Sequence, residues 1–220
     1  MSDKDTIILL HGLWLNGFAM GLMRRRLEHC GYTVHAYSYS SVRLTLSEIA
    51  ERVGRYCNDL GARKLHLVGH SMGGLVALQT AALVPHEYRG RLVLVGTPYA
   101  GSFSGRRLAH LPGGRRLLGC SIAHWLSDEC VAIPADYEVG VIAGSRGIGL
   151  GRLIAPKLPQ PNDGVVSVSE THVPNMRAHI VLPVSHSQML ISREVVRQAC
   201  AFLKHGVFDR ASSVAAKLGV

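Results

Sequence analysis

Short apolar runs alternate with helical stretches along most of the chain, and this alternation constrains the fold more than any other feature. Strands are predicted at residues 6–10, 33–37, 64–68, 91–95, 137–143 and 178–182. Helices are predicted at residues 18–29, 44–60, 72–84 and 188–204. Parallel strands joined by right-handed helical crossovers satisfy such a pattern. We therefore expect the α/β class, with a six-stranded, mostly parallel sheet and helices on both of its faces.

The alternation is interrupted between Pro98 and Pro134, where glycine and proline punctuate short helical pieces and no clean strand is predicted. We expect a small lid-like insert at 97–134 within a single domain that spans 1–205. Residues 206–220 are predicted to form a C-terminal tail.

Composition excludes several classes of protein. Hydrophobic residues make up 47% of the 220 positions and charged residues 18%, so the chain can bury a core and is not disordered. No apolar run approaches the roughly 18 residues that a membrane span requires. The amino terminus does not read as a secretory signal, so we expect a cytoplasmic protein.

The formal net charge is +9, but the basic residues are scattered and no aromatic residues interleave with them. We therefore expect no nucleic-acid partner. The four arginines at 106, 107, 115 and 116 leave open a weak contact with an anionic membrane. The sequence does not indicate an oligomeric state.

Five cysteines are widely spread and include no Cys-x-x-Cys pair. This pattern argues against a disulfide framework and against a zinc site, so we expect mostly buried thiols. Cys120 and Cys130 are the only pair near enough in sequence to suggest a bridge.

The sharpest chemical signal is Gly69-His70-Ser71-Met72-Gly73, which follows the strand at 64–68 and opens the helix at 72–84. This is the context of a nucleophile elbow, in which the serine sits on a tight turn with its hydroxyl above the sheet. Small residues two positions before and after the serine let strand and helix approach closely. Ser71 is therefore the predicted nucleophile.

A serine hydroxyl needs a base, because its own pKa is too high for attack at neutral pH. Of twelve histidines, His186 alone follows the last predicted strand and precedes the last predicted helix. That loop lies at the carboxyl end of the sheet, where ligands of such folds bind. We expect His186 to be the base, with His172 as the alternative.

The base in turn needs a carboxylate that holds its tautomer. Asp163 lies in the Asn162-Asp163-Gly164 turn after the fifth predicted strand, 23 residues before His186. One short hairpin and one strand suffice to bring the two residues together. Glu170 is the weaker candidate.

Acyl transfer also needs donors for the developing oxyanion. The backbone N–H of Met72, directly after the nucleophile, is one candidate. The N–H of Leu13, in the sharp turn that follows the first strand at His11-Gly12, is the other. Asn16 is expected to cap the next helix rather than to contact the oxyanion.

Taken together, His11-Gly12, the elbow at 69–73, Gly96-Thr97-Pro98, Asn162-Asp163-Gly164 and the late His186 resemble the bacterial lipase/esterase branch of the α/β-hydrolase superfamily. The resemblance covers about residues 6–204. It implies a compact member of the α/β-hydrolase fold that lacks the two leading strands, with sheet order 2-1-3-4-5-6 in this chain's own strand numbers. It also implies ester hydrolysis through a covalent acyl-serine.

Relatives with the Asn-Asp-Gly turn often hold calcium through an acid shortly after the histidine. Here Ser187 and Gln188 follow His186, so we expect no metal and no cofactor. The expected substrate is a small-molecule ester or lipid. An acyltransferase or thioesterase on the same triad, and a catalytically silent binding module, remain alternatives, and the sequence leaves acyl chain length undecided.

Overall fold

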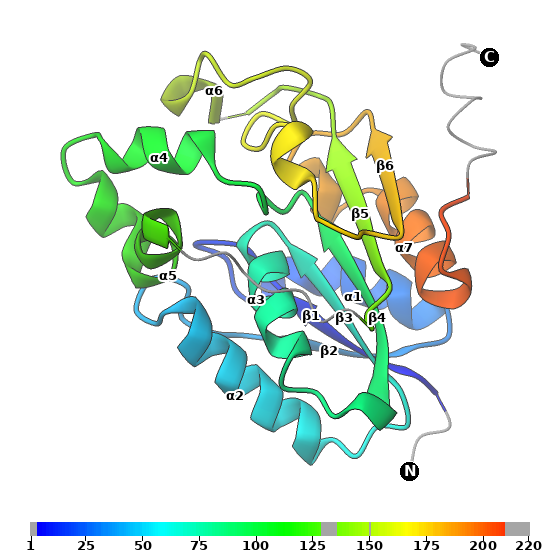
Figure 1. The fold of residues 1–220 in the computed structure, drawn as a ribbon. Coiled ribbons are helices and arrows are strands. Elements are labelled where there is room, and N and C mark those ends of the chain that lie inside the picture. The colour runs from blue at the N-terminus through cyan, green and yellow to red at the C-terminus, as the bar shows by residue number, and fades with distance from the viewer. Residues whose placement is uncertain (1–3, 129–135, 150, 210–220) are drawn as a thin grey trace, which may run out of the picture.

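The protein is a six-stranded sheet covered by helices on both faces (Figure 1). The computed structural model describes residues 4–128, 136–149 and 151–209. The strands are β1 (Thr6–Leu10), β2 (Thr33–Tyr37), β3 (Leu65–His70), β4 (Arg89–Val95), β5 (Val139–Gly144) and β6 (Ala178–Leu182). Their order is β2-β1-β3-β4-β5-β6, and every neighbouring pair is parallel. The predicted sheet and its order are confirmed.

The longer helices are α1 (Gly21–His29), α2 (Leu46–Asp59), α3 (Met72–Ala81) and α7 (Arg193–His205). Successive side chains of a strand point to opposite faces, and each face of this sheet has its own apolar layer. Ile8 and Leu10 pack in a cluster with residues of α2 and α3. Ile7 and Leu9 pack in a second cluster with residues of α1 and α7. Burial on both faces explains why β1 is apolar at every position.

All four predicted helices are shorter than expected, and two of them start with a separate 3-10 helix. The first begins as a 3-10 helix (Gly17–Met20), and the side chain of Asn16 caps it by accepting from the N–H groups of Phe18 and Ala19. The last is divided into a 3-10 helix (Gln188–Leu190) and α7, because Ser192 adopts an extended conformation and caps α7 through the N–H of Val195.

The insert forms α4 (Phe103–Ala109) and α5 (Gly114–Asp128), which lie beyond the carboxyl ends of the strands together with the short α6 (Gly151–Ile154) (Figure 1). Helix α5 is kinked at Gly119, whose φ is +71°. A Cβ atom there would lie 2.5 Å from Cα of Val42, so the kink seats the helix on the loop after β2. The last positions of the predicted insert, 129–134, are outside the described residues.

The expectation that the cysteines form no disulfide framework is wrong for one pair. Cys30, at the end of α1, forms a disulfide with Cys200 of α7, although the two are 170 residues apart in sequence. Sequence spacing concealed the pair, because α1 and α7 meet only when both cover the same face of the sheet. Cys57 is a buried free thiol and Cys120 an exposed one. Cys130 lies outside the described residues.

The first residues of the predicted tail pack on the domain. Phe208 is buried against Phe202 of α7, with ring centroids 5.1 Å apart. Residues 210–220 of the tail lie outside the described part of the chain. Across the described residues, no helix is long and apolar enough to cross a membrane.

Candidate active site

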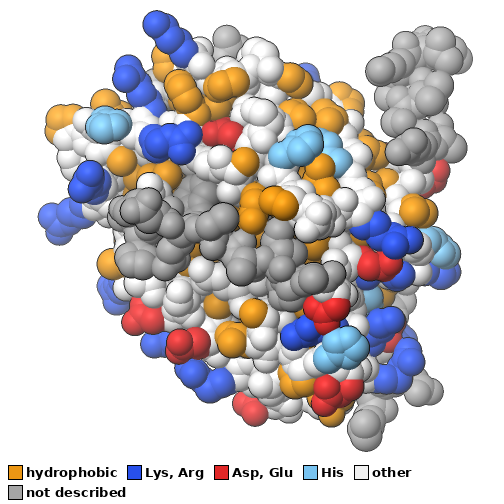
Figure 2. All heavy atoms as spheres, in the orientation of Figure 1, with side chains coloured by type: hydrophobic (Ala, Val, Ile, Leu, Met, Phe, Trp, Pro, Cys, Tyr) orange, Lys and Arg blue, Asp and Glu red, His pale blue; other side chains and the backbone are white. Residues whose placement is uncertain are grey.

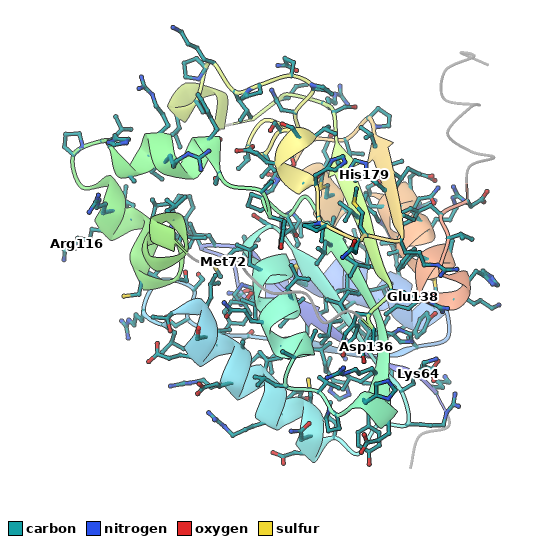
Figure 3. All side chains as sticks on the ribbon, in the orientation of Figure 1. Lys64, Met72, Arg116, Asp136, Glu138 and His179 are labelled. Atoms are coloured by element: carbon teal, nitrogen blue, oxygen red, sulfur yellow. A yellow bond between two sulfur atoms is a disulfide. The ribbon has the colours of Figure 1, made fainter. Side chains whose placement is uncertain are left out.

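Ser71 occupies a sharp turn between β3 and α3. Its φ of +56° is rare for a residue that carries a side chain, and such strain persists only where surrounding structure enforces it. A Cβ atom on Gly69 would lie 2.5 Å from Cα of Gly74, and one on Gly73 would lie 2.6 Å from the carbonyl oxygen of His11. The missing side chains therefore let α3, which starts at Met72 (Figure 3), approach both β3 and the loop after β1.

Asp163 and His186 are in direct contact. Nδ1 of His186 lies 2.7 Å from Oδ2 of Asp163, so a ring N–H donates to the carboxylate. The other oxygen, Oδ1, accepts from the N–H groups of Val165 at 2.9 Å and Val166 at 2.8 Å. The N–H of His186 also donates to the carbonyl oxygen of Asp163 at 2.9 Å. These bonds fix the buried carboxylate in one orientation, and Nε2 is the ring nitrogen of His186 that Asp163 does not hold.

Gly96, at the end of β4, makes room for this pair. A Cβ atom there would lie 3.3 Å from both Oδ2 of Asp163 and Nδ1 of His186, and 2.8 Å from Sδ of Met189. Its φ of +58° is a second reason for glycine. In the sequence, Gly96-Thr97-Pro98 contributes only to the family resemblance. The position of this glycine directly after a buried strand, at the binding edge, was the signal for a local role.

His70, directly before Ser71, supports the backbone of His186. Its Nε2 lies 3.1 Å from the carbonyl oxygen of His186, and the two rings are 4.8 Å apart. Burial, and secondarily the nearby His186, lower the pKa of His70 to about 3, so the ring is neutral. A neutral ring that donates from Nε2 leaves Nδ1 as an acceptor, and Nδ1 is buried with no hydrogen-bond partner among the residues that the structure describes.

Leu13 and Met72 line the same cavity as Ser71. The amides of Leu13 and Met72 make no hydrogen bond to any of the described residues. Gly12 places the loop after β1 against the nucleophile turn, because a Cβ atom on Gly12 would lie 3.0 Å from Cβ of Ser71. Unpaired N–H groups beside a serine hydroxyl are what an oxyanion hole requires.

Trp14 fixes this loop from the other side. Its backbone N–H donates to Oγ of Ser41 at 3.1 Å, and its indole N–H donates to the carbonyl oxygen of Leu117 in α5 at 2.8 Å. Its φ of +62° is unusual for a bulky residue. The loop that carries the amide of Leu13 is thus held by both the segment after β2 and the insert.

A cavity of about 280 Å³ opens beside Ser71 and His186. The amide-bearing loop and the elbow line one side, and the insert and α6 supply most of the apolar wall. The apolar side chains from these two elements are Leu108, Leu118, Ile122 and Ile154. Two polar side chains in the wall already form hydrogen bonds within the protein. Ser102 accepts from the N–H of Gly105, and Ser104 donates to the carbonyl oxygen of Val165. The wall therefore suits a hydrocarbon group.

The alternative candidates lie elsewhere. The carboxylate of Glu170 accepts from the N–H of Phe103 and from both the N–H and the hydroxyl of Ser167, so it anchors the start of α4 to the turn of Asp163. The ring of His172 packs 5.2 Å from that of His179. Neither residue contacts His186. No group of three or more potential metal ligands occurs among the residues that the structure describes.

The arrangement can support a proton transfer chain. A carboxylate holds one imidazole nitrogen, and the imidazole, a strained serine and the residues with the unpaired amides line one cavity. Nucleophile, base and orienting acid of this kind perform acyl transfer on several unrelated folds. The hydrogen bond between the serine and the base is often loose before substrate binds.

Comparison with known proteins places this geometry in context. A family model described as "Alpha/beta hydrolase family" matches residues 7–210, which is nearly the whole chain. A curated protein of Haemophilus influenzae named "Putative esterase/lipase" is 31% identical over 104 residues, covering 44% of this chain. The match spans only 36% of that relative's own length.

Solved structures share the fold. The mature form of the Bacillus licheniformis lipase BlEst2 superposes with a TM-score of 0.74 at 16% identity, covering 93% of this chain and 92% of the lipase. The metagenomic carboxyl esterase MGS0156 superposes with a TM-score of 0.64 at 18% identity, covering 84% of this chain and 65% of that enzyme. At these identities the likeness establishes the fold alone.

Proposed function

The chain belongs to the alpha/beta hydrolase family, and we propose that within it the protein is a serine carboxylic-ester hydrolase whose triad is Ser71, His186 and Asp163. One observation carries the proposal. The serine with strained backbone opens on the same cavity as an imidazole that is held by a buried carboxylate. Structural serines have no need of such strain, whereas a nucleophile elbow does.

In the proposed reaction, Oγ of Ser71 attacks the ester carbonyl while Nε2 of His186 removes the serine proton. Asp163 holds the ring in the tautomer that leaves Nε2 free and stabilises the imidazolium that forms. His186 then protonates the departing alcohol, and an acyl-serine remains. Water attacks the acyl-serine as Nε2 of His186 removes its proton, and His186 then gives that proton to Oγ of Ser71 as the acid leaves.

The backbone amides of Leu13 and Met72 are proposed to stabilise the oxyanion of each tetrahedral intermediate. Loss of one such donor reduces turnover by about 10²–10³-fold in comparable sites. Because both donors belong to the backbone, their placement depends on Gly12 and on the anchoring of Trp14. The apolar cavity formed by the insert and α6 is proposed to hold the acyl chain.

The decisive experiment compares the wild type with Ser71→Ala. The wild type is expected to hydrolyse p-nitrophenyl butyrate and to be labelled at Ser71 by a fluorophosphonate probe, and the variant to do neither while keeping its thermal melting temperature. Full turnover by Ser71→Ala would contradict the assignment. A thioesterase or an acyltransferase would also react with the probe. A thioesterase would hydrolyse acyl thioesters faster than esters, and an acyltransferase would transfer the acyl group to an added alcohol in preference to water.

A further inference from the structure

The insert carries four exposed arginines that lie close together in sequence. Arg106 and Arg107 of α4 and Arg115 and Arg116 of α5 are all exposed. None of the four forms an ion pair with any residue that the structure describes. Residues 97–127 contain no aspartate or glutamate, and the two acids of the insert, Asp128 and Glu129, come after them. The charge is therefore available to an external partner.

Several arginines elsewhere are paired with acidic side chains of the protein. At the starts of β4 and β5, Arg89 pairs with Asp136 at 2.5 Å, and Arg91 pairs with Glu138. Figure 3 shows Asp136 and Glu138 far from Arg116, which projects away from the body of the molecule on α5. In Figure 2, several basic side chains lie over α4 and α5, whereas basic and acidic side chains are mixed over the rest of this face. The protein thus has a basic end at the insert.

Exposed apolar side chains lie among these arginines. Leu111 is 46% exposed in the turn between α4 and α5, and Leu117 is 56% exposed beside Arg116. Trp14 is 57% exposed, and its indole hydrogen bond to the carbonyl oxygen of Leu117 places it next to α5. We name the four arginines, Leu111, Leu117 and Trp14 the insert surface.

We propose that the insert surface docks on an anionic phospholipid bilayer. Guanidinium groups bind lipid phosphates. Leucine and tryptophan side chains that enter the headgroup region are removed from water, which lowers the free energy. Nucleic acid satisfies the arginines equally well but offers no partner for exposed leucines. The proposal does not depend on the chemistry of Ser71, although the surface borders the cavity through Trp14 and would present the cavity to lipid.

The test is co-sedimentation of the whole protein with vesicles of phosphatidylcholine, with and without 30% phosphatidylglycerol. The wild type is expected to bind only the anionic vesicles and to be released by 0.5 M NaCl, since salt screens such contacts. Each basic residue near an anionic surface contributes about fivefold to partitioning, so Arg115→Gln/Arg116→Gln should weaken binding about 25-fold.

The matched control is Arg55→Gln/Arg63→Gln, which removes the same charge from exposed arginines that pair with Glu51 and Asp5. It is expected to bind vesicles as the wild type does. Leu111→Ser should weaken binding by about tenfold, whereas Leu83→Ser, at a comparably exposed leucine outside the insert, should not.

Equal losses in both double variants would overturn the proposal, because binding would then follow net charge alone. Absence of binding to anionic vesicles would overturn it as well. Binding of duplex DNA that depends on Arg115 and Arg116 but not on Leu111, without vesicle binding, would assign the surface to nucleic acid instead. Hydrolysis of p-nitrophenyl butyrate by Arg115→Gln/Arg116→Gln, measured without vesicles, reports separately on the proposed function and is expected to be unchanged.

Discussion

Replacing Asp163 with asparagine tests the proposed proton relay most directly. The side chain keeps its size, so the turn that holds it should survive. Oδ1 accepts from two backbone N–H groups, at 2.9 Å from Val165 and 2.8 Å from Val166, and these donors will select the amide oxygen of the asparagine. Its NH₂ group must then face Nδ1 of His186. That ring nitrogen becomes an acceptor, and the ring proton moves to Nε2, where no proton can be taken from Ser71.

The size of the effect follows from these hydrogen bonds. Turning the amide around to restore the productive tautomer would leave two buried N–H groups without acceptors, at a cost of about 1–3 kcal/mol each. A total of about 2–6 kcal/mol reduces the productive population by about 30-fold to 10⁴-fold. Loss of the negative charge that stabilises the imidazolium adds to this. We therefore expect kcat for Asp163→Asn to fall by about 10³–10⁴-fold.

The assay is initial-rate hydrolysis of p-nitrophenyl butyrate, with thermal melting of each variant as the check on folding. Glu170→Gln is the control, because Glu170 is the other buried acid of the same segment but has no contact with His186. It should lose stability through its bonds to Phe103 and Ser167, yet keep kcat within a few-fold. A folded Asp163→Asn variant with more than a tenth of wild-type activity would refute the reasoning.

Three further predictions concern stability. Gly73→Ala should destabilise the fold by about 1–3 kcal/mol in urea titrations, because the new methyl group overlaps the carbonyl oxygen of His11; an unchanged midpoint would show that the elbow tolerates expansion. Reducing the disulfide, or replacing Cys30 and Cys200 with serine, should cost about 2–5 kcal/mol, since the bond closes a loop of 170 residues; equal melting temperatures with and without reductant would contradict it. His70 has a pKa of about 3 in the folded state against 6.5 unfolded, so only the unfolded chain takes up a proton as pH falls. Stability should therefore be full above about pH 6.5 and decline towards pH 3, and the decline should be shallower in His70→Asn; a parallel decline in both proteins would assign the effect to other groups.

The sheet was predictable because its signals are local. A strand buried on both faces is apolar at every position, as at 6–10, and an amphipathic helix repeats its apolar residues every turn, as in α2. Strand order came from the resemblance rather than from periodicity. Helix ends were less predictable. A single capping side chain such as that of Ser192 can set where a helix begins, and the helix propensity of the neighbouring residues does not show which residue will cap.

The residues of the candidate site were identified from position after strands, and the structure brings Asp163 and His186 into contact. Their catalytic roles stay predictions. Three features were not predicted, because each joins residues that are far apart in sequence. They are the disulfide, the hydrogen bond of His70 to the backbone of His186, and the space that Gly96 leaves for Asp163 and His186.

By itself, the sequence determined which segments become strands and helices and which of them end in chemically capable side chains, because backbone sterics and hydrophobic periodicity act over a few residues. Only the tertiary structure decided which atoms meet. Packing sets the distances between segments, and three features of the site depend on these distances. They are the orientation of the Asp163 carboxylate, the unpaired amides at Leu13 and Met72, and the apolar wall that the insert supplies. Such distances have no local signature, since they are the outcome of the whole core closing at once.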